Sequence, residues 1–512
     1  MSSPVKIRRW EFSGDLSESL PNALPQAISL ETVNFHETSL ELFDDYNRSI
    51  VSKGFALIKE NGKFQLVSAS DLSSIPLEGK GCRKQKAVFW WDFEQNEFQI
   101  SLKNLLKLRA ASPLATTTQQ AQRYNLRNKD GKVIMRLLSE SWLVSDLEIQ
   151  STLTAESLIG YDAEAKSITK RISSLDDFDS PSKTLAWKIL EAVGSAQIPL
   201  SPKQAIQLNS EQSVHDAVSE ITRTMIDISR ATEAGIIEDT DTEFLHDYRV
   251  AVRKLRSVLK LIKGAFLNED TKRLKDIFGD FARKTNRLRD LDVYLLNEQT
   301  YRSQIPDALK PGLNKMFSDF QKERSLQLRS IRRHLKSKTY QSSIEAQRNW
   351  LESAASSEGA RAKLPIKQVC SKEIFKHFKL IPKTGVSIND STPDEEVHEL
   401  RIECKRLRYL LELFSSLYAP SGIKFVSKKL KRLQETLGNF NDYSVQQEFL
   451  FEYIESQKNL DNKTAAAVGG LIAVLNQSKK EARSLVTERF SEFNDRKTAL
   501  VFKELFSKKG GN

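Results

Sequence analysis

The sequence is short of cysteine and of long apolar runs, and each shortage excludes a class of protein. Its three cysteines, Cys82, Cys370 and Cys404, show no CxxC spacing, which argues against a disulfide framework and a zinc site. The most apolar stretch, 465–475, contains two glycines and is shorter than the roughly 18 to 20 residues that span a bilayer. We therefore expect a folded protein of the cytoplasm, a reducing compartment, with no membrane partner.

Acidic residues are too few in the C-terminal part to balance its lysines and arginines. The whole chain carries 78 Lys+Arg and 67 Asp+Glu, a net charge of +11. Residues 1–200 hold 24 Lys+Arg and 25 Asp+Glu, whereas residues 201–512 hold 54 Lys+Arg and 42 Asp+Glu. This asymmetry predicts a polyanionic partner for the C-terminal part, such as nucleic acid, a phosphate polymer or an anionic membrane surface. Charge by itself does not choose among the three.

The hydrophobic pattern of residues 1–145 predicts a strand-rich α+β domain. Short runs of aromatic and β-branched residues alternate with turn signals such as Asn61-Gly62 and Asp130-Gly131. The runs that we expect to include strands are 86–93, 97–102 and 132–138.

The rest of the chain follows a helical pattern. Residues 146–205 predict a linker with peripheral helices, one of them over 184–193. Residues 206–512 repeat their apolar positions with the 3.6-residue period and contain few prolines, which predicts an all-helical domain. Its halves are expected at about 206–350 and 360–507. The whole chain is therefore predicted to be α+β, with strands first and helices after them.

An internal repeat relates the two helical halves. At a constant offset of 152 residues, HDYRVAVRKLRSVLKL (246–261) aligns with HELRIECKRLRYLLEL (398–413). The same register aligns RLRDLDV (287–293) with NFNDYSV (439–445). The repeat predicts a pseudo-twofold bundle of helical hairpins, in which equivalent surfaces of the two halves come together.

Each copy of the repeated helix carries its basic side chains on one face. At about 100° per residue, these side chains lie within roughly 80° of arc, opposite an apolar, core-facing side. We call them the two basic stripes: His246, Arg249, Arg253 and Arg256 in the first copy, and His398, Arg401, Lys405 and Arg408 in the second. Arginine forks and lysine ammonium groups in a row match an anion with many phosphate oxygens. An ordinary alternative for each histidine is a bond to a backbone group of the first helical turn.

Further charged residues accompany the stripes. Basic residues at helical spacings on neighbouring helices could line a channel between the halves, and those that we assign to the site are Lys275, Arg287, Lys428 and Lys431. Asp290 and Asp442 occupy equivalent positions in the two copies. Because a carboxylate aimed at a polyanion would repel it, we expect both aspartates to orient a helix end or to pair with a stripe arginine.

These motifs resemble the two halves of the CHAD domain, the conserved histidine α-helical domain, over about residues 206–507. The resemblance implies an all-helical domain of two four-helix bundles with pseudo-twofold symmetry. It further implies that inorganic polyphosphate binds, without a cofactor, in a basic central cavity lined by the two stripes. It also makes polyphosphate granules an alternative to the free cytosol as the location.

The N-terminal part, through residues 34–67, resembles the CYTH family, a triphosphate-tunnel β-barrel often fused ahead of CHAD. That family begins with Glu-x-Glu-x-Lys, whose carboxylates hold a divalent metal and whose lysine binds phosphate. Aligned on Phe12, this chain has Ile7, Arg9 and Glu11 at those positions. An apolar and a basic residue in place of oxygen ligands predict a catalytically degenerate domain, without a metal, that serves for docking or scaffolding.

The sequence leaves two other functions open beside non-catalytic polyphosphate binding. A metal-dependent triphosphatase of the CYTH type, assisted by the helical domain, would need acidic ligands. A nonstandard set is Glu37, Glu41, Asp44, Asp45, Asp92, Glu94 and Glu97. RNA binding by the basic domain would need aromatic side chains among the basic ones, and the stripes have none, so we expect no sequence-specific nucleic acid. The oligomeric state and the preferred polymer length stay open.

Overall fold

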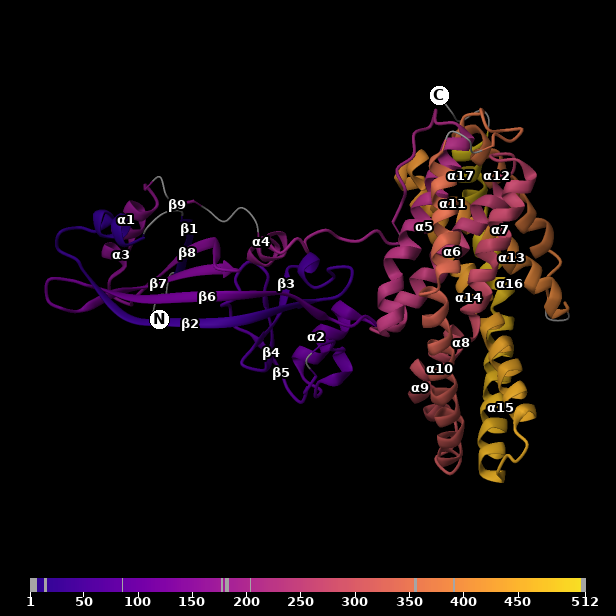
Figure 1. Cartoon of the computed structure of the whole chain (residues 1–512), viewed down its shortest axis with the longest axis horizontal. Coiled ribbons are helices and arrows are strands. Elements are labelled where there is room, and N and C mark those ends of the chain that lie inside the picture. Colours follow the sequence, from indigo (N-terminus) through magenta and orange to yellow (C-terminus); the bar gives the residue numbers. More distant parts are fainter. Residues whose placement is uncertain are drawn as a thin grey trace. The chain divides into compact units, whose positions relative to one another are not determined.

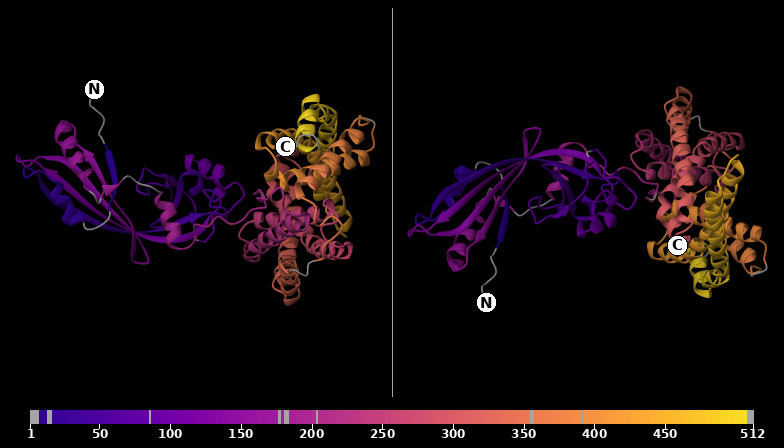
Figure 2. Two further views of the ribbon diagram at one scale, coloured as in Figure 1. Left: turned by 90° about the horizontal axis from the view of Figure 1, so that it is seen from above. Right: turned by 90° about the horizontal axis from the view of Figure 1, so that it is seen from below.

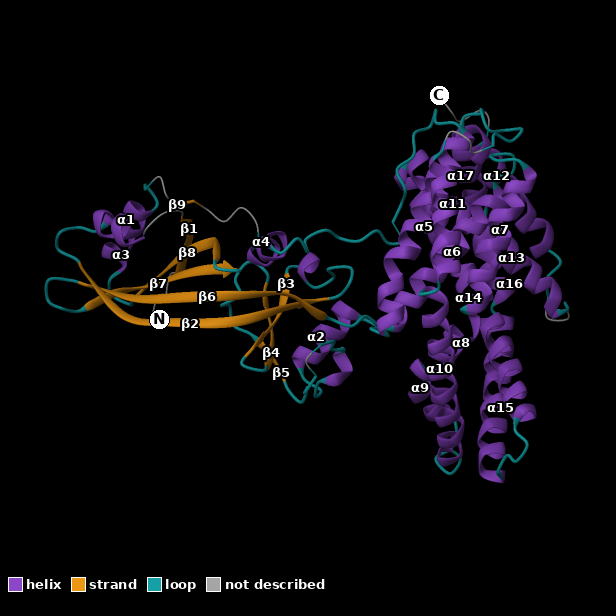
Figure 3. Cartoon of the chain, in the orientation of Figure 1, coloured by secondary structure: helices purple, strands orange, loops and turns teal. Residues whose placement is uncertain are grey.

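The structure is a computed structural model that describes residues 7–12, 16–84, 86–175, 178–179, 184–202, 204–353, 357–389 and 392–507. The chain divides into two units, Met1–Pro199 and Leu200–Asn512. The first contains a large sheet and the second consists of helices, coloured orange and purple in Figure 3. The predicted α+β class, with strands before helices, is confirmed.

One antiparallel sheet forms the first unit, with the strand order β5-β4-β3-β2-β6-β7-β8-β1-β9 (Figure 1). Its strands are β1 Ile7–Phe12, β2 Ser29–Asp44, β3 Phe55–Glu60, β4 Lys63–Ser68, β5 Leu77–Gly79, β6 Ser112–Arg127, β7 Val133–Val144, β8 Leu147–Ser157 and β9 Phe178–Asp179. The long strands β2 and β6 run side by side, as two further views show (Figure 2). Their register extends from Ser29 opposite Arg127 to Asp44 opposite Ser112.

Short helices cover parts of this sheet. They are α1 Leu16–Ala23, α2 Glu97–Leu106, α3 Asp162–Ile172 and α4 Leu185–Ala192, with 3₁₀ turns η1 Val51–Lys53 and η2 Trp90–Asp92. One apolar cluster joins α1 and α3 to β1, β7 and β8, a second joins α4 to β2 and β7, and a third joins α2 to β3 and β4. Burial of these clusters holds the helices on the sheet.

The Asn61-Gly62 turn predicted in this unit is confirmed, but two of the predicted strands are wrong. Asn61-Gly62 joins β3 to β4 with positive φ at both residues, as a tight hairpin of this type requires. Residues 133–138 lie in β7, as expected. The strand predictions for 86–93 and 97–102 are wrong, because these segments hold η2 and the start of α2. Phe98, Leu102 and Leu105 recur at helical spacing and are all buried, which selects the helix.

The segment 146–205 differs from the linker that we expected. It contains β8, which pairs with both β7 and β1, so the first unit extends to Pro199. β8 lies inside the sheet although it contains many polar residues, including Thr152 and Thr154, and the sequence analysis did not identify it as a strand. The helix predicted over 184–193 is confirmed as α4.

The helical unit follows the repeat closely. Its helices are α5 Val214–Glu238, α6 Thr242–Leu261, α7 Asn268–Lys284, α8 Asn286–Leu296, α9 Glu298–Gln304, α10 Leu313–Leu335, α11 Lys338–Glu352, α12 Ile366–Gly385, α13 Asp394–Leu413, α14 Pro420–Ser456, α15 Asn462–Ser484, α16 Val486–Phe493 and α17 Arg496–Phe506. Short 3₁₀ turns occur at η3 Lys310–Gly312 and η4 Ser415–Leu417. Helices α5, α6 and α7 begin 152 residues before α12, α13 and α14 respectively.

The two copies differ in one long helix. The first copy breaks into α7, α8 and α9 at Thr285 and Asn297, whereas α14 continues through the equivalent Leu437 and Phe449. The O–H of Tyr294 donates to the carbonyl of Gln446, its own counterpart 152 residues later, at 2.8 Å. A residue can touch its counterpart only near the symmetry axis, so the pseudo-twofold axis passes close to this contact.

Candidate functional site

The two basic stripes lie on helices that pack against each other, α6 and α13. The opposite side of each helix is buried, for example Leu255 in α6 and Leu407 in α13, each 0% exposed. Arg253 and Arg256 are exposed, whereas Arg401, Lys405 and Arg408 are half-buried. Burial of the apolar face therefore directs the basic face of each helix away from the core.

The stripes meet in a cluster of positive charge, which we call the central cationic cluster: Arg253 of α6 with Arg401, Lys405 and Arg408 of α13. The pKa of Lys405 is lowered to about 8, first by burial and then by the positive charges of Arg401, Arg253 and Arg408. Burial also lowers the pKa of Arg401, and Arg408 and Arg253 add to the effect. The cluster contains cations from both halves of the repeat, as the symmetry predicts.

Several donors of this cluster lack a partner within the described part of the chain. The Nε atoms of Arg401 and Arg408 are buried and make no hydrogen bond. Arg408 Nε lies 3.4 Å from a Glu412 oxygen, without the alignment that a hydrogen bond needs. Among the described residues, the Lys405 ammonium has no carboxylate within ion-pair distance. Buried donors without partners are rare in folded proteins, so they point to an external acceptor.

The first-copy counterpart of Arg401 is used differently. Arg249 Nη1 donates to the Ala282 carbonyl at 3.2 Å and to Thr285 Oγ1 and Asn286 Oδ1, both at 2.8 Å. Two of these acceptors are side chains at the break between α7 and α8, and their equivalents in α14, Leu437 and Gly438, have no side-chain acceptor. Burial, followed by the charge of Arg253, lowers the pKa of Arg249 to about 10. Since α14 has no such break, the two halves of the site are unequal.

Of the paired aspartates, Asp442 lies within ion-pair distance of a stripe arginine, as we expected, whereas Asp290 is linked to Arg249 only through the effect of its charge. Asp442 lies 4.0 Å from Arg401 Nη2. The charge of Arg249 opposes the effect of burial, which raises the pKa of Asp290. Both carboxylates therefore accompany the equivalent arginine of their own copy.

A second group of cations lies next to the stripe of α6, and we call it the outer cationic cluster: Arg256, Lys260, Lys275 and Arg406. Burial lowers the pKa of Lys260, and the charges of Arg406, Lys275 and Arg256 lower it further. Lys260 and Arg406 were missed by the sequence analysis. Lys260 lies four residues after Arg256 and continues the stripe by one turn, so helical spacing could have found it. Arg406 lies off its stripe, and only packing brings it close.

Other predicted site residues do not belong to the two cationic clusters. Arg287 forms two bonds to Glu323, of 2.6 and 2.8 Å, and its guanidinium covers the Phe449 ring at 4.1 Å. Lys431 lies 3.6 Å from Glu435, and Lys428 is exposed. His398, the fifth residue of α13, is exposed, whereas His246 is half-buried and already interacts within the protein.

In the first unit, cations inside the sheet region are paired with carboxylates. Arg9 contacts Asp71 and, at 3.2 Å, the buried Glu140. Lys188 lies 2.9 Å from Glu11, and Lys59 lies 3.1 Å from Glu41. These cations therefore leave little positive charge for an anion.

The carboxylates considered as metal ligands also hold neighbouring protein groups. Asp44 accepts the backbone N–H groups of Asp45, Ile50 and Val51. Asp92 accepts the N–H of Phe89, and Glu37 accepts from Gln120. Within the described ranges, His, Cys, Asp and Glu form no group of three or more that could hold a metal ion.

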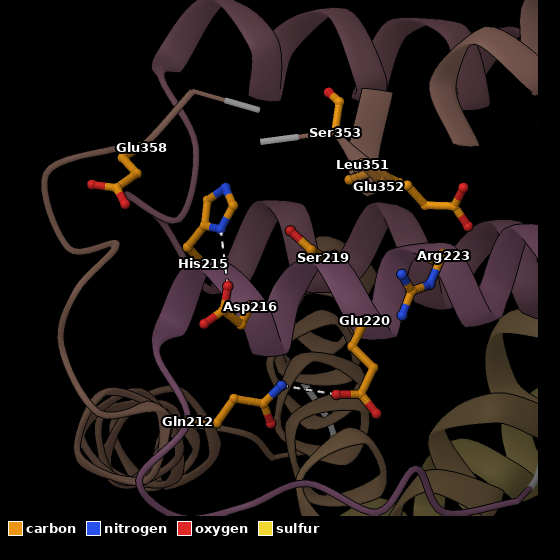
Figure 4. A pocket seen from close by; sticks show the side chains of 10 residues that line it. All are labelled: Gln212, His215, Asp216, Ser219, Glu220, Arg223, Leu351, Glu352, Ser353 and Glu358. Atoms are coloured by element: carbon orange, nitrogen blue, oxygen red, sulfur yellow. Dashed lines mark hydrogen bonds and ion pairs between the residues drawn. The ribbon is translucent and has the colours of Figure 1, made fainter. Parts of the chain in front are cut away.

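A separate pocket of about 600 Å³ lies in the helical unit between α5 and the end of α11 (Figure 4). Its lining residues are Gln212, His215, Asp216, Ser219, Glu220, Arg223, Leu351, Glu352, Ser353 and Glu358. Because carboxylates outnumber cations here, this pocket does not suit a polyanion.

In the part of the chain that the structure covers, we find no helix long and apolar enough to cross a membrane.

Comparison with known proteins places the helical unit. Residues 220–450 match the CHAD domain family. Two uncharacterized proteins of Mycobacterium tuberculosis, from strains H37Rv and CDC 1551, are each 25% identical over 278 residues, which is 52% of this chain and 49% of the relative. The chain thus spans about half the length of these curated relatives.

Two solved structures are also similar. The crystal structure of the CHAD domain from the plant Ricinus communis has a TM-score of 0.49 and 25% identity, covering 57% of this chain and 96% of that one. PptA from Streptomyces chartreusis has a TM-score of 0.43 and 12% identity, covering 55% and 99%. On the family match, residues 220–450 of this chain form a CHAD domain.

Proposed function

We propose that the helical unit binds inorganic polyphosphate, without hydrolysing it, at the central and outer cationic clusters. The observation that carries the proposal is that α6 and α13 pack together and form one cationic cluster, in which burial first, and then the charges of Arg401, Arg253 and Arg408, lower the pKa of Lys405 to about 8. Cations held this close repel one another, and a ligand with many phosphate oxygens relieves the repulsion. The resemblance to CHAD domains supplies the identity of the polymer.

The asymmetry of the two copies assigns different tasks to their arginines. Arg249 is held by Ala282 and Thr285, so it contributes charge from a fixed position. Arg401 keeps a buried Nε without a partner, so it is available to donate to a phosphate oxygen. The second copy therefore provides the direct hydrogen bonds, and the first copy provides fixed positive charge together with the exposed Arg253 and Arg256.

The first unit serves as a CYTH-like docking or scaffolding domain without triphosphatase activity. Its support is the pairing of Arg9 with Asp71 and Glu140 at the strand where the CYTH family places its metal-binding motif. Here a guanidinium already pairs with two carboxylates, which are therefore not free to bind a divalent cation. The triphosphatase alternative would require these pairs to separate.

A competition titration tests the proposal. The purified full-length protein is titrated with long-chain polyphosphate, tripolyphosphate and generic RNA at two salt concentrations, first without metal and then with Mg²⁺, while released phosphate is assayed. We expect preference for long polyphosphate, weaker binding at high salt and no release. Release of phosphate from tripolyphosphate only with Mg²⁺ would contradict the proposal and favour the triphosphatase.

A further inference from the structure

A surface of the first unit combines aromatic and basic side chains, the combination that the stripes lack. It lies in residues 80–109, between β5 and β6, and includes η2 and α2. This segment holds seven Lys or Arg and three Asp or Glu, whereas residues 1–200 together are nearly neutral. Six of the seven cations are exposed: Lys80, Arg83, Lys84, Lys86, Lys103 and Lys107.

The aromatic side chains of this surface form a stacked pair with an exposed outer ring. Phe89 and Trp91 stack with 4.5 Å between ring centroids and 10° between planes. Trp91 is 41% exposed, and Trp90 meets it edge-on at 5.3 Å. An exposed indole on top of another ring is a surface on which a further flat ring can stack.

Cations lie beside these rings. Lys103 Nζ is 4.6 Å from the Trp90 ring. Lys84 Nζ is 5.6 Å from the Phe89 ring, but it is paired with Asp92 at 2.8 Å. The indole N–H of Trp90 donates to the carbonyl of Lys107 at 2.8 Å, which fixes this ring at the end of α2. Below them, Phe93, Phe98 and Leu102 are buried in the third apolar cluster, so the surface rests on a packed base.

We propose that this aromatic–basic platform, formed by Phe89, Trp90, Trp91, Lys103 and Lys107, binds single-stranded nucleic acid. A base stacks on the exposed side chain of Trp91, and backbone phosphates lie against the lysines. Stacking accepts every base, so the binding is tolerant of sequence. A lipid surface fits less well, because Phe89 and Trp90 are half-buried and their rings stack instead of projecting outward. The inference is independent of polyphosphate binding by the helical unit.

The test uses the full-length protein and a fluorescein-labelled oligouridine, followed by fluorescence anisotropy. Trp91→Ala should weaken binding by roughly tenfold, the loss expected for one base–aromatic stack. Lys103→Glu with Lys107→Glu should also weaken it strongly. The matched control is Lys129→Glu with Lys132→Glu, which makes the same charge change at exposed positions around the β6–β7 turn. This control should bind within about twofold of the unchanged protein, because exposed charges outside the contact act weakly.

Two further variants separate the outcomes. Trp91→Phe keeps a ring and should keep most of the affinity, so the proposal stays testable if Trp91→Ala misfolds. Arg253→Glu with Lys405→Glu should bind the oligouridine like the unchanged protein. Unchanged binding in both the Trp91→Ala and the lysine variants would overturn the proposal, as would loss of binding in the Arg253/Lys405 variant. Trp91-dependent sedimentation with phosphatidylcholine–phosphatidylglycerol vesicles, without oligouridine binding, would overturn it in favour of a membrane.

Discussion

Arg9 in the sheet unit and the central cationic cluster in the helical unit are both partly withdrawn from water, but their charges are compensated to different degrees. In the sheet unit, Arg9 contacts the carboxylates of Asp71 and Glu140. In the central cationic cluster, burial and then the charges of Arg401, Arg253 and Arg408 lower the pKa of Lys405, and Asp442, which is 4.0 Å from Arg401, opposes this effect only in part. Desolvating a charge is costly unless a partner of opposite sign compensates it. The comparison teaches that a potential anion site is recognised by incomplete compensation, and not by the number of basic residues.

The largest effect on polyphosphate binding is expected from reversing the charge of the central cationic cluster. Arg253→Glu with Lys405→Glu should weaken polyphosphate binding by about 100-fold or more, because attraction becomes repulsion at the contact. Titration with labelled polyphosphate measures the loss, and circular dichroism should show unchanged helix content. Loss of the fold instead would mean that the stripes are structural.

The control for this variant keeps the net charge change and moves its position. Lys322→Glu with Lys363→Glu alters exposed lysines that lie 3.9 Å and 3.3 Å from carboxylates. It should bind polyphosphate within a few-fold of the unchanged protein. An equal loss in both variants would show that net charge, and not the cluster, drives binding.

In the sheet unit, the corresponding test removes a carboxylate that compensates the charge of Arg9. Glu140 is 1% exposed and accepts from Arg9, Ser73 and Gln119. Glu140→Ala should lower the free energy of unfolding of this unit by about 3 kcal/mol, because Arg9 loses a buried partner. Urea unfolding followed by tryptophan fluorescence measures the change. Glu31→Ala, which removes an exposed partner of Arg127, should have a much smaller effect, and equal effects would contradict our explanation.

A change of pH tests the central cationic cluster, because it changes the protonation of Lys405. Its pKa falls from an ordinary 10.5 to about 8 in the folded protein. Raising the pH from about 7 to about 9 removes its proton, so polyphosphate affinity should fall by up to about tenfold. The free protein itself should become more stable between pH 8 and 10.5, because there the unfolded chain binds the proton more tightly.

Isothermal titration in buffers of different ionisation enthalpy, near pH 8, checks whether a proton is taken up on binding. Lys405→Arg keeps the charge over this range and should flatten the pH dependence. If its affinity fell with pH as steeply as that of the unchanged protein, another group would be responsible.

The smallest expected effect concerns Arg287, a predicted site residue that the structure pairs with Glu323. Arg287→Ala should change polyphosphate affinity by less than about twofold, because its charge is already compensated, and stability by about 1 kcal/mol or less. Glu323→Gln should strengthen binding slightly by releasing Arg287. A large loss of affinity in Arg287→Ala would show that the ion pair opens to receive the ligand.

Sequence spacing predicted the helical unit better than the sheet unit. The 152-residue offset and the two stripes follow from the 3.6-residue period, which depends only on neighbouring positions. In the sheet unit, aromatic residues in 86–102 favoured strands, but Phe98, Leu102 and Leu105 pack as a helix on β3 and β4. β8 was missed although Leu147, Ile149, Leu153 and Ala155 alternate with polar residues, a pattern that favours a strand. Strand pairing depends on distant partners that local pattern does not contain.

The sequence by itself determined the repeat, the basic face of each repeated helix and the basicity of the C-terminal part, because these are properties of composition and spacing. Only the tertiary structure decided which cations have an incompletely compensated charge. It brought Arg253 beside Arg401 and Lys405, gave Arg287 to Glu323, and placed the α7–α8 break where Arg249 binds it. Compensation depends on groups tens of residues away along the chain, and folding alone brings those groups within the few ångströms over which charges and hydrogen bonds act.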